Sequence, residues 1–168
     1  GTSEVRITGG NNSTAIFIGV NGGTSSGIID FVGDATFATA LSNTGAGTGL
    51  VGNVNSKLIF RGNLTLNQEA FVAISTFSPG TFEFDGTGTQ TITWNNSGFY
   101  CEMNNVVIGN SNSPTVNHAG SVISDNILGN LTLNGSSVLN LGTRFWNGGT
   151  SGGGTGNAGT LTLNSTSK

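Results

Sequence analysis

The side chains best suited to acid–base chemistry are eight carboxylates, and two pairs of them lie close together in the sequence. Asp30 and Asp34 occur in "IIDFVGDA", and Glu83 and Asp85 occur in "TFEFD". A glycosidase needs two carboxylates that face each other across a sugar. However, Gly33 is expected to break the strand between the first pair. Glu83 is expected to point outward between two core phenylalanines, with Asp85 in a turn. We therefore predict that these groups are solvated surface residues or turn caps.

Residues for metal binding or nucleophilic catalysis are scarce. His118 is the single histidine, so no histidine-based zinc site or triad can be built, and its surroundings predict a turn. Cys101 is the single cysteine, which excludes an internal disulfide and favours a small buried residue. The G-G-x-G-x-D repeat of calcium-binding β-rolls is absent, and "DGTG" at 85–88 supplies one carboxylate. We expect no enzymatic activity and no cofactor, with a structural calcium ion as the weaker alternative.

Aromatic side chains are the remaining candidates for a binding site, because exposed rings can stack on sugars. The four candidates are Trp94, Tyr100, Phe145 and Trp146. Phe145 and Trp146 are adjacent in "TRFWNGG", and adjacent side chains face opposite sides of an extended strand. One of these two rings would then lie outside. The alternative is that a ring covers the end of an inserted loop.

The composition predicts a folded all-β protein with a polar, nearly uncharged surface. The 168 residues suffice for one domain, and 8% of them are charged, against about 25% in ordinary soluble domains. The net charge is −3 and the five basic residues form no patch, which argues against nucleic-acid binding. No apolar run approaches the roughly 18 residues of a membrane-spanning helix. Surfaces rich in Asn, Thr, Ser and Gly are typical of extracellular bacterial surface proteins.

Short runs with a strand-like pattern occur along the whole chain, and no segment shows a helical period. Clusters of Gly, Asn and Ser separate the runs and predict turns, because Gly and Asn tolerate positive φ. Runs that start about every 8–12 residues fit a β-sandwich or a β-solenoid. The predicted strands are 4–8, 15–20, 28–32, 36–41, 57–60, 64–66, 71–74, 81–84, 89–94, 105–109, 121–124, 126–133, 137–141 and 160–163.

A repeated hexapeptide favours the solenoid over the sandwich. "GNLTLN" occupies 62–67 and 129–134, and "GTLTLN" occupies 159–164. Each rung of a stacked coil must match its neighbour, whereas a sandwich has no need to reuse a hexapeptide. The interval between the first two copies predicts about three rungs. The shorter interval between the last two predicts one rung that carries a Gly-rich inserted loop at 147–159.

Alternation within the hexapeptide predicts the direction of each side chain. The leucines are expected to stack inside the coil, the threonines to form an outer file, and the final asparagines to lie at a corner and hydrogen-bond to the next rung. These structural repeat residues are Leu64, Leu66, Asn67, Leu131, Leu133, Asn134, Leu161, Leu163 and Asn164.

Two longer stretches resemble a known family. The stretch "GTFEFDGTGTQTITWNNSGFYCEMNNVVI" (80–108) and the later "NILGNLTLNGSSVLNLG" (126–142) are similar to β-solenoid repeat regions of very large secreted surface proteins of Bacteroidetes. Many of those resemble adhesins exported by the type IX secretion system. The resemblance covers residues 55–168, and the segment 1–50 fits in composition alone. It implies a right-handed parallel β-helix with Gly- and Asn-rich turns, extracellular display, and an adhesive or scaffolding role.

The leading hypothesis is therefore a non-enzymatic structural or adhesive segment at the bacterial cell surface. Residues 1–168 are expected to be a single β-solenoid segment of a longer repeat protein, because the repeat pattern is still running at residue 164. Its expected partners are neighbouring rungs of that longer chain, with surface polysaccharide or the secretion machinery as further candidates, and neither nucleic acid nor a membrane span is expected. One alternative is a carbohydrate-binding or carbohydrate-active β-helix. Another is an ice-binding solenoid, which needs a regular threonine array and is disfavoured by the irregular rung lengths.

Overall fold

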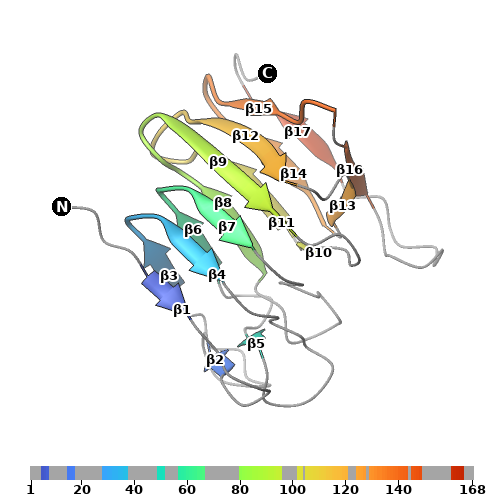
Figure 1. Cartoon of the computed structure of the whole chain (residues 1–168). Coiled ribbons are helices and arrows are strands. Elements are labelled where there is room, and N and C mark those ends of the chain that lie inside the picture. The colour runs from blue at the N-terminus through green and yellow to red at the C-terminus, as the bar shows by residue number, and fades with distance from the viewer. Residues whose placement is uncertain are drawn as a thin grey trace.

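The structure, a computed structural model, consists of β-strands and turns wherever it is described. The described residues are 5–7, 15–17, 28–37, 49–51, 57–66, 80–95, 102–103, 105–120, 124–127, 129–143, 145–148 and 160–164. Figure 1 shows the strands side by side in layers, with β1 and β17 at opposite ends of the stack. The sequence-based prediction of an all-β chain is confirmed.

Two sheets of six strands dominate the architecture, and we call them sheet A and sheet C. Sheet A runs in the order β1 (Val5–Ile7), β4 (Ala35–Phe37), β7 (Leu64–Leu66), β9 (Thr89–Trp94), β12 (Thr115–Gly120) and β15 (Val138–Asn140). Sheet C runs in the order β3 (Ile28–Phe31), β6 (Lys57–Phe60), β8 (Thr81–Phe84), β11 (Asn105–Ile108), β14 (Leu131–Leu133) and β17 (Leu161–Leu163).

Two smaller sheets complete the described strands. Sheet B pairs β2 (Ala15–Phe17) with β5 (Gly49–Val51). Sheet D contains β10 (Glu102–Met103), β13 (Ser124–Ile127) and β16 (Phe145–Gly148). In chain order the strands visit sheet A, then sheet B or D, then sheet C, and then sheet A again; between β7 and β8 the described residues include no strand of a small sheet.

Every pairing between described strands is parallel. The sheets of an immunoglobulin-type sandwich are antiparallel, so the alternative fold predicted from the sequence does not fit. Parallel sheets visited in rotation are consistent with a parallel β-helix. Strands β1, β3 and β4 join sheets A and C, so described parts of the segment 1–50 belong to the same architecture as the rest.

The length of chain between paired strands varies, while the pairing stays continuous. In sheet A, the partners Val5 and Ala35 lie further apart in the sequence than the partners Thr115 and Val138. The extra residues therefore lie in the connections between strands. In sheet C, the connection from β14 to its partner β17 contains the predicted insertion at 147–159. Residues 149–159 lie outside the described residues.

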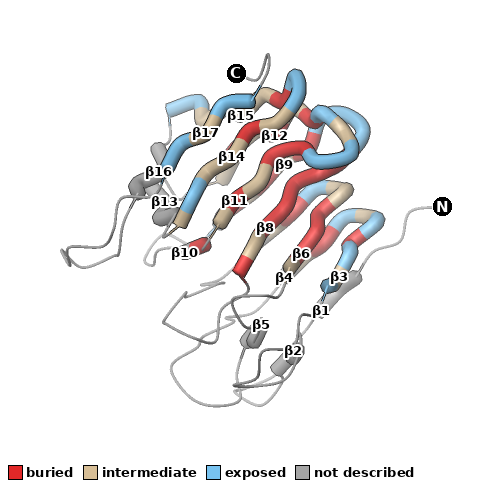
Figure 2. The backbone as a smooth tube through the Cα atoms, turned by 180° about the vertical axis from the view of Figure 1, so that it is seen from behind, coloured by how far each residue is buried: buried red, intermediate tan, exposed pale blue. Residues whose placement is uncertain are grey.

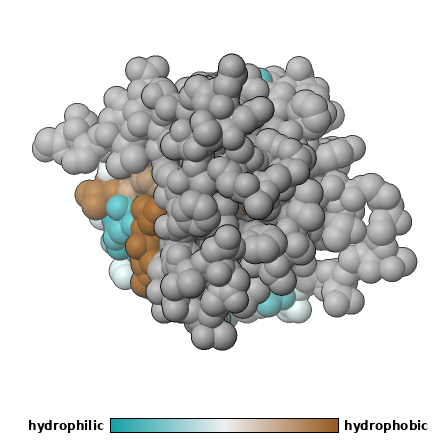
Figure 3. Space-filling view, turned by 90° about the horizontal axis from the view of Figure 1, so that it is seen from below, coloured by the Kyte–Doolittle hydropathy of each residue, from teal (hydrophilic) through white to brown (hydrophobic). Residues whose placement is uncertain are grey.

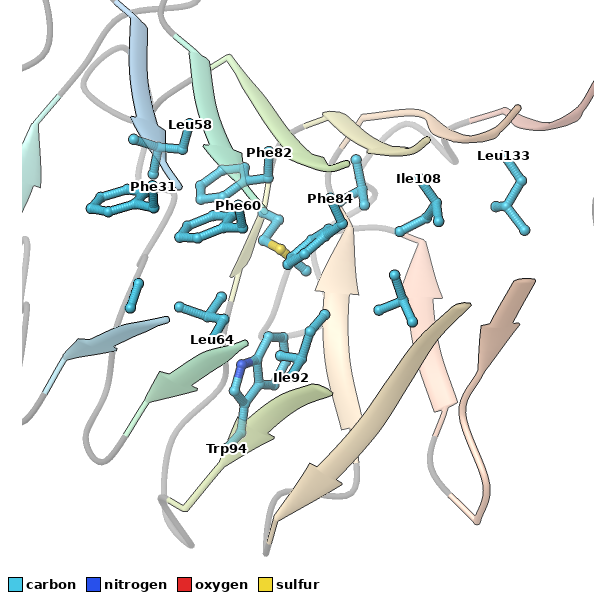
Figure 4. Close-up of a cluster of buried hydrophobic side chains, with 14 residues drawn as sticks. Phe31, Leu58, Phe60, Leu64, Phe82, Phe84, Ile92, Trp94, Ile108 and Leu133 are labelled. Carbon is cyan, nitrogen blue, oxygen red and sulfur yellow. The ribbon is translucent and has the colours of Figure 1, made fainter. Parts of the chain in front are cut away.

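The core lies between sheets A and C and is built from files of inward-facing side chains. Phe31, Phe60 and Phe84 are paired in register on adjacent strands of sheet C. The ring centroids are 5.1 Å apart for the first two and 5.4 Å for the last two, and both pairs are stacked. Figure 4 shows these rings facing Leu64 and Ile92 of sheet A. Stacked aromatic pairs contribute about 0.5–1.5 kcal/mol beyond the burial of their surface.

The buried file of sheet C reaches the edge strand β3 at Phe31 but ends before the other edge strand, β17. Figure 2 shows buried residues concentrated in β6 and β8 and exposed ones in the turns and in β17. Among the described residues, the exposed large hydrophobic ones are Ile28 and Val32 at the β3 edge and Leu161 and Leu163 at the β17 edge. Seen from below, hydrophobic and hydrophilic areas lie side by side at the left margin of the surface (Figure 3).

Several predicted strands were right and others were wrong. The observed bounds agree with the prediction at 57–60, 64–66, 81–84 and 89–94. The predicted run 126–133 is divided between β13 and β14, because residues 129–130 form a bend between the sheets. The turn predicted around His118 is wrong, because Thr115–Gly120 is one of the two longest described strands. The predicted strand 71–74 lies outside the described residues.

Candidate functional site

Three of the carboxylates weighed as candidates for catalysis lie on the outer side of sheet C, where they pair with two basic side chains. We call this group the Arg61 cluster; it consists of Asp30, Lys57, Arg61, Glu83 and Asp85. They come from three adjacent strands, β3, β6 and β8, and from the turns that follow them. We call the stretch of chain between two successive strands of one sheet a winding, equivalent to a rung. The cluster therefore joins consecutive windings.

Arg61 lies at the centre of the cluster. Its Nε donates to both carboxylate oxygens of Asp30, at 2.9 and 3.0 Å. Its Nη1 donates to Oδ2 of Asp85 at 3.1 Å. The hydrogen bond with Asp30, together with the charges of both carboxylates, outweighs the opposing effect of burial and raises the pKa of Arg61 above its ordinary value. The guanidinium is thus a permanent cation between two carboxylates.

Asp85 is fully buried and is held by donors on both of its oxygens. Its Oδ1 accepts the backbone N–H groups of Asn110, Ser111 and Asn112, at 2.8, 3.0 and 2.8 Å. Burial alone would raise the pKa of Asp85, but these three backbone donors and Arg61 outweigh it, so the pKa lies below its ordinary value. Asp85 is thus an ionised cap of the 110–112 turn. A turn cap was one of the two roles predicted for it, whereas the solvated alternative is wrong because Asp85 is buried.

Glu83 connects Lys57 to the next winding. Its Oε2 accepts a hydrogen bond from Lys57 Nζ at 2.8 Å, and its Oε1 accepts one from Asn110 Nδ2 at 3.3 Å. The Glu83 side chain is 3% exposed although its position in β8 faces outward between Phe82 and Phe84. The outward direction was predicted, and the burial was not.

The arrangement leaves little opportunity for acid–base chemistry. Asp30 and Asp85 share Arg61, and Asp34 Oδ1 accepts the backbone N–H of Asn63 at 2.7 Å. The catalytic pair of a glycosidase must instead face a sugar and exchange protons with it. A carboxylate surrounded by N–H donors is also a poor cation ligand. In the part of the chain that is described, no three His, Cys, Asp or Glu residues are grouped so that they could hold a metal ion.

Gln90 forms a second buried polar connection that the sequence did not reveal. Its Oε1 accepts the N–H of Gly86 at 2.8 Å, and its Nε2 donates to the carbonyl oxygens of Phe60 and Gly62, at 2.9 and 2.7 Å. Gly86 must lack a side chain, because a Cβ would lie 2.5 Å from the Arg61 carbonyl oxygen. The "DGTGTQ" segment is therefore a turn that is fixed to the preceding winding.

The predicted aromatic candidates do not form one platform. Trp94 is 2% exposed and belongs to the core, where its ring lies edge-on to His118 with centroids 4.8 Å apart. The expectation of an exposed ring is wrong for Trp94, because it alternates inward with Gln90 and Ile92 along β9. Phe145 and Trp146 open strand β16, but their side chains lie outside the described residues. Tyr100 and Cys101 also lie outside them.

The last two copies of the hexapeptide pair in register as predicted, and the first does not join them. The prediction that their leucines lie inside the coil is wrong for Leu161 and Leu163, which are exposed because β17 is the edge strand of sheet C. Strands β14 and β17 pair in register, with Leu131 beside Leu161 and Leu133 beside Leu163. The first copy forms β7 in sheet A instead. The sequence predicted about three rungs between the first two copies. Because these copies lie in different sheets, the interval is not a whole number of windings. A Leu-Thr-Leu strand suits either sheet, because both need alternate apolar residues on the inner side.

The asparagines of the hexapeptide link neighbouring windings. Asn164 Nδ2 donates to Asn134 Oδ1 at 2.6 Å, and Asn134 Nδ2 donates to the Gly109 carbonyl oxygen at 2.7 Å. The second residue of the motif has a similar role, which the sequence did not reveal. Asn63 Oδ1 accepts the N–H of Thr91 at 2.8 Å, and Asn130 Oδ1 accepts that of Thr160 at 2.9 Å. Asn67 and the side chain of Leu66 lie outside the described residues.

Comparisons with known proteins provide no relative. No family model, curated protein or solved structure matches the chain. Within the described residues there is no helix of the length and apolarity that crossing a membrane requires.

Proposed function

We propose that the chain is a segment of a right-handed parallel β-solenoid in a large secreted bacterial surface protein, with a structural and adhesive role and no enzymatic activity. The observation that carries this proposal is the continuous parallel pairing of six strands in each of two sheets. Backbone pairing between successive windings produces a stiff rod that is stabilised mainly by neighbouring windings. The resemblance of residues 55–168 to surface-protein repeats supplies the cellular setting.

The edge at β17 supports the proposal that further windings are the natural partners. Leu161 and Leu163 are 60% and 56% exposed, although they continue the inward files of Leu131 and Leu133. An unpaired strand edge with apolar side chains favours the addition of another strand. A winding with the same Leu-Thr-Leu pattern would cover both leucines and continue the asparagine ladder.

Association of the isolated chain tests this proposal. We expect the wild-type chain to self-associate as its concentration rises in light-scattering measurements after size exclusion. The double variant Leu161→Lys/Leu163→Lys should remain monomeric, because charges replace the apolar edge. The matched control is Thr162→Lys on the same strand, which should associate like the wild type. A wild-type chain that stays monomeric at high concentration would contradict the proposal.

Adhesion and catalysis are tested separately. Beads coated with the chain are expected to adhere to surface polysaccharide more than beads coated with an unrelated β-protein of the same charge. No reducing ends should appear when the chain is incubated with the same polysaccharide. Release of reducing ends that is lost in Asp30→Asn or Asp85→Asn would overturn the non-enzymatic assignment.

The second candidate function is carbohydrate binding at Phe145 and Trp146. Phe145 and Trp146 lie in the extended strand β16, and adjacent side chains of an extended strand face opposite sides. Strand β16 is also an edge strand of sheet D. Under this hypothesis, Phe145→Ala or Trp146→Ala should weaken retardation of the chain in polysaccharide gels. Equal retardation of both variants and the wild type would exclude it.

A further inference from the structure

The outer side of sheet A carries an array of mostly hydroxyl and amide side chains. The inward positions of its strands are occupied by buried residues such as Leu64, Ile92 and Val116, so the alternate positions face outward. Across β4, β7, β9, β12 and β15 these outward positions form three files. The files are Thr36–Thr65–Thr93–Ala119, Thr91–Asn117–Asn140 and Thr89–Thr115–Val138.

The array is two-dimensional and regular because of the strand register. Neighbouring strands in a sheet lie about 4.8 Å apart, and outward side chains along one strand repeat at about 6.7 Å. The pairing of Thr36 with Thr65 and of Thr65 with Thr93 places three hydroxyls in one file across adjacent strands. The windings between them differ in length, but the differences are absorbed outside the strands. The irregular rung lengths that argued against a threonine array therefore do not disturb it.

The side chains of this face are also held in place. Threonine is β-branched and has few side-chain rotamers. Asn140 Nδ2 donates to Asn117 Oδ1 at 2.9 Å, and the backbone of Thr91 is fixed by Asn63. Groups that are ordered before binding lose less conformational entropy when a ligand arrives. The face thus suits a ligand that is itself rigid and periodic.

The chemistry of the face narrows the class of ligand. None of the described outward side chains of β4, β7, β9, β12 and β15 is charged or aromatic. An ionic polymer would find no counter-charge there, and a sugar would find no ring to stack on. Arg6 takes the register position next to Thr36 on the edge strand β1, and its side chain lies outside the described residues.

We infer that this face of sheet A binds ice. Crystalline water presents an uncharged, rigid lattice of hydrogen-bond donors and acceptors. Each threonine hydroxyl can donate and accept a hydrogen bond. The methyl group of the same side chain provides apolar surface between neighbouring hydroxyls. A rigid array of such groups can match a rigid lattice at many points together.

Thermal hysteresis and the shaping of ice crystals test the inference. The wild-type chain should separate the melting and freezing temperatures and produce faceted crystals at high protein concentration. Thr65→Lys introduces a long charged side chain into the middle of the first file and should remove most of the hysteresis. The matched control is Thr132→Lys. Thr132 occupies the same Leu-Thr-Leu sequence but lies on the outer side of sheet C, so this variant should keep the wild-type hysteresis.

Circular dichroism of each variant separates loss of binding from loss of fold. If Thr65→Lys does not fold, Thr93→Lys on the next strand tests the same file and should show the same loss. Absence of both hysteresis and faceting in the folded wild type would overturn the inference. An equal loss of hysteresis in Thr132→Lys would overturn it as well, because the activity would then not belong to sheet A.

Discussion

The outer sides of sheet A and sheet C differ, although the two sheets enclose the same core. On sheet C, Arg61, Glu83 and Asp85 bind residues of neighbouring windings, with Lys57 paired to Glu83 and Arg61 shared by Asp30 and Asp85. On sheet A, the outward side chains described for β4, β7, β9, β12 and β15 are mostly threonines and asparagines, together with Ala119 and Val138, and none of them is charged. The comparison indicates a division of roles, in which one side fixes the windings to each other and the other side remains available for contact.

Truncation of a side chain in the shared core is expected to lower the free energy of unfolding more than any change on either outer side. Phe60→Ala removes the middle ring of the Phe31–Phe60–Phe84 stack and should lower the free energy of unfolding by about 3–5 kcal/mol. Chemical denaturation measures the change. Leu161→Ala is the control, because this side chain is 60% exposed and its removal should have a much smaller effect. Equal effects would mean that the stack is not the centre of the core.

Removal of the buried carboxylate of sheet C is expected to have the next largest effect. Asp85→Ala leaves three backbone N–H groups and the Nη1 of Arg61 without their acceptor, and unsatisfied groups cost about 1–3 kcal/mol each when buried. Because Asn110 and Ser111 are exposed, water can bind some of the freed N–H groups. We therefore expect the free energy of unfolding to fall by about 3 kcal/mol in total. Asp30→Ala removes the exposed partner of Arg61 and should cost about 1 kcal/mol or less. A reversed order would show that Asp85 does not fix the turn.

The same carboxylate should make stability depend on pH. The folded-state pKa of Asp85 lies below its ordinary value of 3.8, so folding favours the ionised form. This contribution is fully present above the ordinary value and is lost as the pH falls through the folded-state pKa. The difference in unfolding free energy between the wild type and Asp85→Asn should therefore be constant near neutral pH and shrink below about pH 4. A difference that does not change with acidity would contradict the role of the charge.

Substitutions on the outer side of sheet A should have the smallest effect on stability. Thr65→Lys is expected to change the free energy of unfolding by about 0.5 kcal/mol or less, because Thr65 faces outward and is only half-buried. Thermal denaturation would detect a larger change. A loss comparable to that of Asp85→Ala would show that sheet A also depends on its outer side chains, and the division of roles would fail.

The sequence was most informative where apolar and polar residues alternate between Gly- or Asn-rich turns. Strands 81–84 and 89–94 were predicted with their observed bounds for this reason. Strand 115–120 was missed because its second inward residue is His118, which breaks the apolar alternation. The Arg61 cluster could not be predicted, because its contacts join residues 24 to 31 positions apart. Those contacts depend on connection lengths that no local pattern determines.

Constant register combined with variable connections has a consequence for how such a chain can change over generations. The connection between the partners Val5 and Ala35 is longer than the one between Thr115 and Val138, yet the outward files of sheet A continue from strand to strand. An insertion or deletion in a connection therefore leaves the side-chain pattern of both outer sides unchanged. Mutation can lengthen, shorten or decorate the connections while selection acts independently on each side of the molecule.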